Sequence, residues 1–335
     1  MRYPLPPRRR APAARRLILG GLVLFAALPA RAQDVGDRLQ VALDTGEAEA
    51  VLAILETRAG GAEPDAAAWE ALFAAEGYRR LKEREATMQR PFTDDEFRAF
   101  VLSDSLAARA PALRRTLEAW RTANLDAAAA RAFAYLPEGA VIRAKVYPAI
   151  KPRGNSFVYD LEGDPAIFLY LDPEIEAAKF ENTVAHELHH IGFAAACADP
   201  ALGVDDGAPA GVALARRWAS AFGEGLAMLA AAGGPDIHPH AASAPDERAV
   251  WDRDVAHVGR DMPRVEAFLL DLAEGRVADE EEARRRGLEL IVSDGVPQGP
   301  FYTVGWYVAA TVERELGRPR LLEALCDPAA LLGAY

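Results

Sequence analysis

Residues 186–190 read His-Glu-Leu-His-His, and three of them have the types and spacing that suit a bound metal ion. His186 and His190 stand four residues apart, and Glu187 directly follows the first histidine. Four residues are slightly more than one helical turn, so on a helix both imidazoles project from one face. Zinc bound in this way lowers the pKa of a coordinated water, and a neighbouring carboxylate can accept the proton. The pattern predicts one Zn²⁺ ion held by His186 and His190, with Glu187 as general base.

The alternative interpretation is a helix whose histidines serve packing or solvation, or a vestigial motif. Three of the six histidines of the chain fall within these five residues, which makes a chance pattern a poor explanation. Two unpaired imidazoles on a buried helix would be costly, and this favours metal binding. His189 is an unusual residue at its place in the motif and is either exposed or placed beside the ligands. The segment also carries an apolar stripe at helical spacing, formed by Phe180, Thr183, Val184, Leu188 and Ile191.

A catalytic zinc site needs a third protein ligand, and Glu224 is the candidate. It interrupts an apolar helical stretch and has Gly223 and Gly225 on either side. A glycine inside a helix costs ~1 kcal/mol relative to alanine, and close approach of another backbone would justify both glycines. An ionised carboxylate on that face needs a compensating charge, which a metal ion would provide. The alternatives are a salt-bridged glutamate at the helix surface, or ligation by His238 or His240 from a following loop.

Hydrolysis at such a site also needs a donor for the oxyanion that forms, and Tyr302 is the candidate. Gly299 and Pro300 would present Tyr302 at the start of a helix, and Gly305 would allow close packing. The alternative is an aromatic stripe within the core, formed by Phe301, Tyr302, Trp306 and Tyr307.

These residues resemble those of the gluzincin metallopeptidases, in which two histidines of His-Glu-x-x-His and a glutamate on a following helix bind zinc. More closely, the chain resembles an uncharacterised bacterial family of predicted exported zinc peptidases, over about residues 140–335. The resemblance implies His186, His190 and Glu224 as ligands and Glu187 as general base. In the thermolysin-like branch an aspartate follows the ligand glutamate by four residues, whereas Met228 occupies that position here. The resemblance is carried by residues 186–190, 224–227 and 299–305.

The elements that must position these residues indicate an α+β fold, predominantly helical, with a zincin-like core and a small β-sheet beside the motif helix. Residues 46–134 are almost wholly helical in pattern and include a capping box at residues 93–96. Asp172 and Pro173 mark the start of a helix that runs through the motif towards Ala196. Short β-like runs precede it at residues 141–147, 156–159 and 167–171.

We predict three parts in the chain: a signal peptide at residues 1–32, a helical N-terminal subdomain at 33–136 and a zincin-like catalytic domain at 137–335. The run 167–171 either pairs with an extended peptide at the edge of the cleft or packs into the core. Further helices are predicted over residues 212–232, 247–258, 264–274, 280–291 and 303–316.

The N-terminus has the pattern of an export signal. Five arginines between residues 8 and 16 precede an apolar run at residues 17–28, and an Ala-Arg-Ala cleavage site ends at Ala32. The run is too short to span a bilayer comfortably, so a retained anchor is the less favoured alternative. We expect a periplasmic or secreted protein that begins at Gln33. Arg15 and Arg16 leave the twin-arginine route open beside the general secretory route.

The net charge of the chain limits the classes of binding partner that we expect, and its cysteine content limits the kinds of site. Loss of residues 1–32 removes seven arginines and no acidic residue, so the formal net charge falls from −12 to −19. Such a surface repels nucleic acid and anionic lipid, so we expect neither as a partner of the mature protein. The number and spacing of Cys197 and Cys326 do not form a zinc site. The sequence leaves open whether they form a disulfide in an oxidising compartment. It does not predict the oligomeric state.

Three functions fit these features. The first is an exported zinc-dependent peptidase with a peptide or protein substrate. The second is a zinc amidase or other hydrolase of a small or cell-wall substrate, which would use the same water. The third is a non-catalytic exported binding protein whose fold the metal braces, although a structural site has no need of a base such as Glu187.

Overall fold

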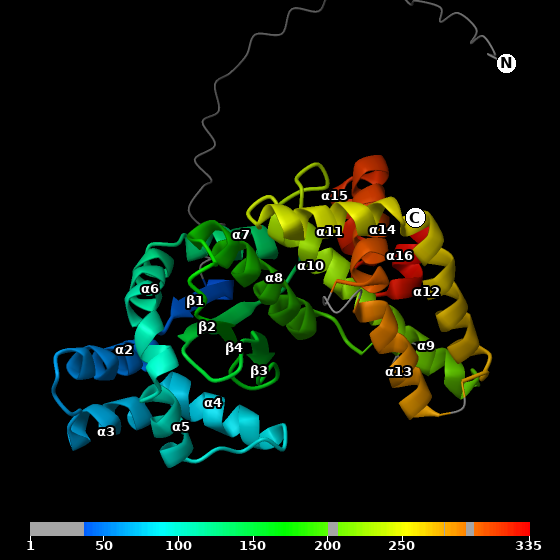
Figure 1. Cartoon of the computed structure of the whole chain (residues 1–335). Coiled ribbons are helices and arrows are strands. Elements are labelled where there is room, and N and C mark those ends of the chain that lie inside the picture. Colours follow the sequence, from blue (N-terminus) through cyan, green and yellow to red (C-terminus); the bar gives the residue numbers. More distant parts are fainter. Residues whose placement is uncertain (1–36, 200–206, 278, 293–297) are drawn as a thin grey trace, which may run out of the picture.

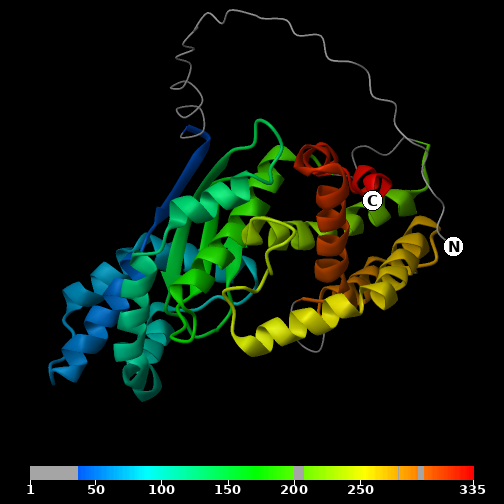
Figure 2. The ribbon, with the colours of Figure 1, turned by 90° about the horizontal axis from the view of Figure 1, so that it is seen from above.

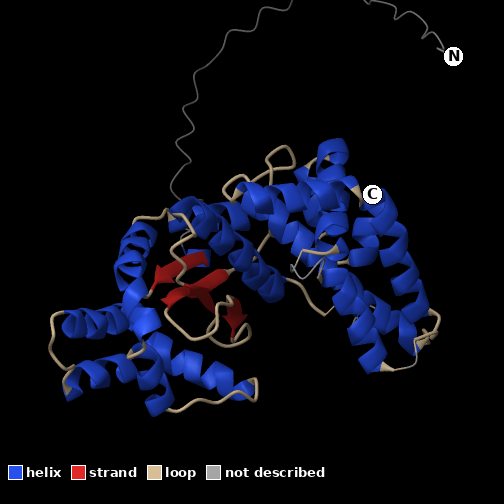
Figure 3. Ribbon diagram, in the orientation of Figure 1, coloured by secondary structure: helices blue, strands red, loops and turns tan. Residues whose placement is uncertain are grey.

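A four-stranded mixed sheet lies among helices that make up most of the structure (Figure 3). The computed structural model describes residues 37–199, 207–277, 279–292 and 298–335. The predicted signal peptide, residues 1–32, lies outside these ranges. The predicted α+β fold, predominantly helical with a small sheet, is confirmed. No described helix is both long and apolar enough to cross a membrane.

The sheet has the order β1-β2-β4-β3. β1 and β4 are parallel to β2, and β3 is antiparallel to β4. Three of the strands match the predicted β-like runs. The strand nearest the N-terminus was not predicted, because its short run of five residues pairs with a partner about 100 residues further along the chain. The strands are β1 (Leu39–Leu43), β2 (Ile142–Ala149), β3 (Phe157–Tyr159) and β4 (Ala166–Tyr170).

Strand β4 lies inside the sheet and not at its edge. Over Ala166–Phe168 it is paired with β2 on one side and with β3 on the other. The interpretation of residues 167–171 as an edge strand for an extended peptide is therefore wrong along this stretch. The Phe168 side chain is fully buried and stacks on Tyr147, with the ring centroids 4.8 Å apart. Core packing is thus the role of Phe168.

The first five helices lie around this sheet on the side remote from the C-terminus, and the sixth lies above the sheet, nearer the C-terminal half (Figure 1). The predicted capping box is confirmed at the start of one of them, where Thr93 and Glu96 exchange hydrogen bonds. Reciprocal bonds of this kind satisfy backbone N–H groups that a helix start leaves unpaired. The helices are α2 (Gly46–Ala59), α3 (Ala66–Ala74), α4 (Glu76–Thr87), α5 (Asp94–Val101), α6 (Asp104–Arg121) and α7 (Leu125–Phe133).

Helix α8 (Ala177–Ala196) carries the motif and presents two different faces. Its apolar face packs into the core that includes the sheet, through the buried residues Phe180, Val184, Leu188 and Ile191. The helix starts later than predicted, because Asp172 makes a turn at Pro173 and accepts hydrogen bonds from the backbone N–H groups of Glu174 and Ile175. The small sheet beside the motif helix is as predicted.

The remaining helices form the other half of the structure. Figure 2 shows two of them, α11 and α12, as an almost continuous run beside α14. The helix predicted over residues 212–232 is split by a 3-10 turn at Ser220–Phe222, where Gly305 of another helix approaches the Phe222 backbone. The helices are α9 (Ala210–Ala219), α10 (Gly223–Ala232), α11 (Pro245–Ala256), α12 (Val258–Ala273), α13 (Glu280–Ile291), α14 (Pro300–Leu316), α15 (Arg318–Ala324) and α16 (Pro328–Ala334).

Two clusters of buried apolar side chains stabilise the two halves. One contains residues of α2 to α7, of the sheet and of α8, and the other contains residues of α9, α10 and the helices that follow. Helix α8 lies between the sheet and α10 (Figure 1). Its apolar face packs towards the sheet, and its opposite face is directed towards the C-terminal half. The division of the chain at residue 136 stays a prediction.

Candidate metal centre

Three side chains from two helices converge on one point between the halves. His186 and His190 come from α8 and Glu224 from the first turn of α10. The two Nε2 atoms lie 3.0 Å apart, and Glu224 Oε2 lies 3.1 Å from Nε2 of His190 and 3.3 Å from Nε2 of His186. The predicted histidine pair and the predicted third residue therefore meet.

This arrangement fits a zinc ion in donor type and in spacing. Imidazole nitrogen and carboxylate oxygen are common zinc donors, and catalytic sites often combine two histidines with one glutamate. Donor atoms bound to tetrahedral zinc at ~2.0–2.1 Å lie roughly 3.3–3.4 Å from one another. The observed spacings of 3.0 to 3.3 Å are close to this value. Three donors leave a fourth position for water or substrate.

Neighbouring side chains stabilise the ionised form of the Glu224 carboxyl group. Burial alone would raise the pKa of this carboxyl, but the adjacent imidazoles of His190 and His186 lower it well below its usual range. The group therefore stays ionised although it is largely enclosed, which a buried carboxylate does only when its charge is compensated. An ionised oxygen that faces two imidazole nitrogens is the form a metal ligand requires.

Gly225 explains how Glu224 comes so close to α14. A Cβ atom on Gly225 would lie 2.0 Å from the backbone nitrogen of Trp306 and 2.6 Å from the carbonyl oxygen of Tyr302. The predicted close backbone approach is confirmed for Gly225. It is wrong for Gly223, since no atom of another element lies within 4 Å of the position its Cβ would take. Only one of the two glycines is needed for the contact between helices.

Tyr302 and Glu187 lie beside the three converging side chains of His186, His190 and Glu224, a group that we call the metal cluster. The Tyr302 ring lies parallel to the His186 ring, with the centroids 6.4 Å apart. Burial raises the pKa of Tyr302, and the charge of Glu224 and a hydrogen bond to it act in the same direction. Of the predicted aromatic stripe, Phe301 and Trp306 are buried in the core, whereas Tyr302 and Glu187 line a common cavity. Tyr302 is partly buried, packs against the same core as Phe301 and Trp306, and in addition reaches the cavity.

Comparison with protein families adds a finding to this geometry. Residues 69–335 match the model of a family described as "Putative zinc dependent peptidase (DUF5700)". The chain belongs to this family. No curated protein and no solved structure matches the chain. The family description agrees with the cluster of His186, His190 and Glu224, and zinc dependence is what it implies for this member.

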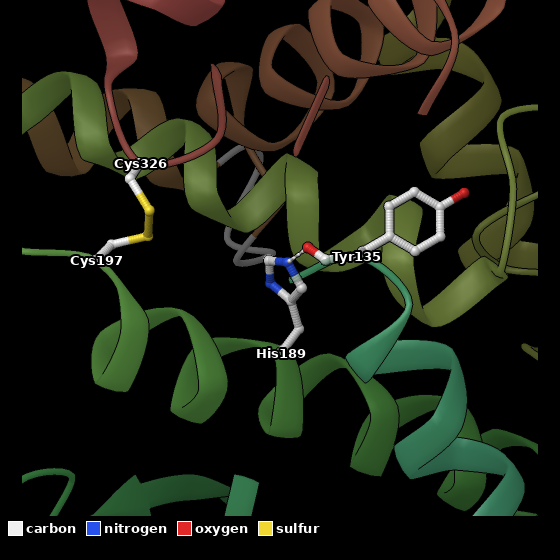
Figure 4. The surroundings of a disulfide bond; sticks show 4 residues. All are labelled: Tyr135, His189, Cys197 and Cys326. Atoms are coloured by element: carbon white, nitrogen blue, oxygen red, sulfur yellow. Dashed lines mark hydrogen bonds between the residues drawn. A yellow bond between two sulfur atoms is a disulfide. The ribbon is translucent and has the colours of Figure 1, made fainter. Parts of the chain in front are cut away.

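His189 of this family member is neither exposed nor part of the cluster. It is fully buried, and its Nε2 lies 3.2 Å from the carbonyl oxygen of Tyr135, as the dashed line in Figure 4 marks. Burial lowers the pKa of His189 to about 3, so the ring is neutral and donates this hydrogen bond. The bond fastens α8 to the segment that follows α7. His189 therefore positions the motif helix.

The same view shows the Cys197–Cys326 disulfide, which the sequence left open (Figure 4). Cys197 ends α8, and Cys326 lies between α15 and α16. Their Cα atoms are 5.1 Å apart, and 129 residues separate them in the chain. The bond joins the motif helix to the C-terminal half, which also supplies Glu224 and Tyr302.

The two loop histidines lie outside the metal cluster. His238 contacts Asp252, with 2.9 Å between Nε2 and Oδ1, and His240 contacts Ser243, with 3.0 Å between Nδ1 and Oγ. Neither belongs to the group of converging donors, so the interpretation that one of them replaces Glu224 is wrong for the described residues. His240 nevertheless lines the same cavity as His186.

That cavity has a volume of about 480 Å³ and runs from the cluster towards the first turns of α8 and α11. Several of its residues were missed in the sequence. Lys179 and Asn182 could have been found, because they precede His186 by seven and four residues and so share its helical face. No pattern distinguished the others, which come from loops and from α11. The polar residues missed are Lys179, Asn182, Ser243, Asp246, Glu247 and Gln298.

Proposed function

We propose that this family member is an exported zinc-dependent peptidase that hydrolyses peptide bonds with the gluzincin set of ligands. The proposal depends on one observation. Nε2 of His186, Nε2 of His190 and Oε2 of Glu224 lie within 3.3 Å of one another, beside the cavity that Glu187 and Tyr302 line. His186, His190 and Glu224 would hold the ion.

Bound zinc would supply a water of lowered pKa and polarise the carbonyl group of the substrate. Glu187 would accept the proton of the attacking water and return it to the leaving amine, because it is the carboxylate beside the cluster that is not among the three ligands. The Tyr302 hydroxyl, whose pKa lies above its ordinary value, stays protonated and would donate a hydrogen bond to the oxyanion.

The Glu187→Gln variant tests this assignment. It keeps the shape of the side chain but cannot accept a proton, so we expect full zinc content and at least a ~100-fold loss of peptide hydrolysis. Elemental analysis and an assay with mixed peptides measure the two quantities. Glu70→Gln, an exposed change on α3, is the matched control and should leave both unchanged.

Other outcomes favour the other functions. A Glu187→Gln protein as active as the wild type would remove Glu187 as the base. A zinc-loaded wild type that cleaves no peptide but hydrolyses cell-wall fragments would favour the amidase. Absence of any turnover, together with a large loss of thermal stability on chelation, would favour a binding protein braced by metal.

Export is supported by two independent features. Residues 1–32 have the pattern of a signal peptide, and the Cys197–Cys326 bond is of a kind that persists in oxidising compartments. Amino-terminal sequencing of protein from the periplasm or medium should begin at Gln33. Protein found only in the cytoplasm with Met1 in place would contradict export.

A further inference from the structure

One short stretch of chain contacts all three helices that carry the candidate site. Residues 131–135 cover the end of α7 and the two residues that follow it. Hydrogen bonds join this segment to α8, which carries the two histidines, to α10, which carries Glu224, and to α14, which carries Tyr302. Two of its residues, Arg131 and Tyr135, make these contacts.

Tyr135 makes hydrogen bonds in two directions. Its carbonyl oxygen accepts the bond from Nε2 of His189 on α8, and its ring extends away from His189 (Figure 4). At the far end of the ring, the hydroxyl group donates a hydrogen bond of 2.9 Å to Oε2 of Glu313, a residue of α14. Arg318, the first residue of α15, donates a hydrogen bond of 2.6 Å to the same hydroxyl group and one of 2.8 Å to Oε1 of Glu313. Helices α8 and α14 are therefore joined through a single residue.

Burial makes this connection a rigid one. Tyr135 is 1% exposed, and the Glu313 side chain is 9% exposed. The Arg318 guanidinium lies over the Tyr135 ring, with Cζ 4.0 Å from the ring centroid. Hydrogen bonds to charged groups are stronger than those between neutral groups, and burial excludes the water that would compete for them. The Tyr135 side chain is thus held in one position between α8 and α14.

Arg131 makes the corresponding contact with α10. Its Nε donates a hydrogen bond of 3.1 Å to the carbonyl oxygen of Ala231, seven residues after Glu224 on that helix. Carbonyl groups in the last turn of a helix have no partner within the helix, so a side-chain donor satisfies one of them. Glu313 follows Tyr302 by eleven residues, about three helical turns, so both lie on one face of α14. The segment therefore contacts α10 and α14 about two and three turns beyond their site residues.

We propose that Tyr135 is a positioning residue for the metal centre, because it joins α8 to α14 and, together with Arg131 on α10, fixes how the three helices are placed. The inference rests on the metal site of the proposed function. It goes beyond the role of His189, since a residue outside the three helices determines their mutual arrangement. Donors that must meet at one ion tolerate displacements of only ~0.5 Å. Loss of a contact that aligns their helices should therefore weaken zinc binding.

The Tyr135→Phe variant tests this role, because it removes the hydroxyl group and keeps the ring. Glu313 and Arg318 still pair with each other, so neither buried charge loses its partner. We expect zinc affinity to fall by ~10-fold, the lower end of the effect when a group that orients a metal ligand is lost. Competition with a chelator measures this affinity without any substrate.

Tyr78→Phe is the matched control. Tyr78 is also 1% exposed, and its hydroxyl group donates a hydrogen bond to Asp94, which pairs with Lys82, but it lies on α4 in the N-terminal half. This change should lower the melting temperature about as much as Tyr135→Phe and leave zinc affinity unchanged. Wild-type zinc affinity in Tyr135→Phe would overturn the inference. An equal fall in both variants would overturn it as well, since weaker binding would then follow from lost stability alone.

His189 provides a second test that holds even if Tyr135→Phe does not fold. His189→Leu removes the donor to the Tyr135 carbonyl group, whereas His189→Gln keeps an N–H group that can reach it. The leucine variant should bind zinc about 10-fold more weakly than the glutamine variant. Equal affinities in the two variants would contradict the role of this hydrogen bond in positioning the ligands.

Peptide hydrolysis tests the contact with α14 separately. Tyr135→Phe should lower kcat by about 10-fold, because a small displacement of Tyr302 misplaces its hydroxyl group. The same change made in a Tyr302→Phe protein should lower kcat little further, since residues that act through one another are not additive. Full additivity would show that Tyr135 does not act through Tyr302. A zinc-loaded wild type that cleaves no peptide would contradict the peptidase function, whereas the chelator competition would still decide whether Tyr135 positions the ligands.

Discussion

Glu224 is the member of the metal cluster that comes from outside α8, and it joins the motif to a second helix. We expect Glu224→Gln to weaken zinc binding by more than ~100-fold, since loss of even a group that only orients a ligand costs ~10–100-fold. Competition with a chelator measures the affinity. The Glu70→Gln protein should keep the wild-type affinity. Unchanged zinc retention in Glu224→Gln would remove this residue from the ligands.

Tyr302 differs from its neighbours on α14 by its place beside His186. Tyr302→Phe removes only the hydroxyl group, so we expect kcat to fall by about 100-fold, as when one oxyanion donor is lost, with zinc content unchanged. Tyr307→Phe is the control, because Tyr307 is exposed on the same helix. Steady-state kinetics separate kcat from KM. A rise of KM alone would assign Tyr302 to substrate binding.

At the scale of single residues, the sequence predicted the features that depend on local spacing or on a residue type unusual for its surroundings. The histidine pair follows from the helical period, and Glu224 stood out as an acid within an apolar stretch. His240 could not be assigned, because its place in the cavity is decided by the packing of a loop against Trp251 and Asn182. The role of Tyr302 stays a prediction, because the same residue packs against the core and lines the cavity.

At the scale of elements, the contact between α10 and α14 positions Glu224 relative to Tyr302. We expect Gly225→Ala to destabilise the protein by ~1–3 kcal/mol, because its methyl group would overlap the backbone of α14. The helices would have to separate, so zinc retention should fall too. Urea unfolding and elemental analysis measure both effects.

Gly223→Ala is the matched control for this change. The two glycines are two residues apart on α10, but a methyl group on Gly223 meets no other element within 4 Å. Alanine there should be neutral or should stabilise the helix by about 0.5–1 kcal/mol. Equal destabilisation by both variants would mean that helix propensity, and not the close approach to α14, governs these positions.

Helix period and strand composition predicted most elements, and tertiary contacts explain the exceptions. β1 is short and pairs with β2 across about 100 residues, so no local pattern marks it as a strand of this sheet. The 3-10 turn at Ser220–Phe222 interrupts a stretch whose apolar residues keep helical spacing. It lies where Gly305 of α14 approaches the Phe222 backbone. Such interruptions depend on a neighbour that periodicity does not reveal.

At the scale of the whole molecule, the candidate metal site lies at the junction of two apolar clusters. His186 and His190 belong to α8, whereas Glu224 and Tyr302 belong to helices of the other cluster. His189 and the disulfide at Cys197 join α8 to its surroundings. Stability of the junction and integrity of the site should therefore change together.

The disulfide offers a test of this coupling. Closing a loop of 129 residues restricts the unfolded chain by about 5 kcal/mol in the loop-entropy model, and removal of a native disulfide costs ~2–5 kcal/mol. We expect the double variant Cys197→Ala with Cys326→Ala to melt roughly 5–10 °C lower than the wild type, by scanning calorimetry. Zinc retention should weaken in the same variant, because α8 loses a tie to the half that supplies Glu224.

Reductant provides the control for this prediction. It should lower the melting temperature of the wild type towards that of the double variant and leave the double variant unchanged, because no other cysteine exists in the chain. If the variant melted lower but held zinc as tightly as the wild type, the disulfide would stabilise the fold without supporting the site. The positions of α8 and α10 would then be maintained by their own packing and by the His189–Tyr135 hydrogen bond.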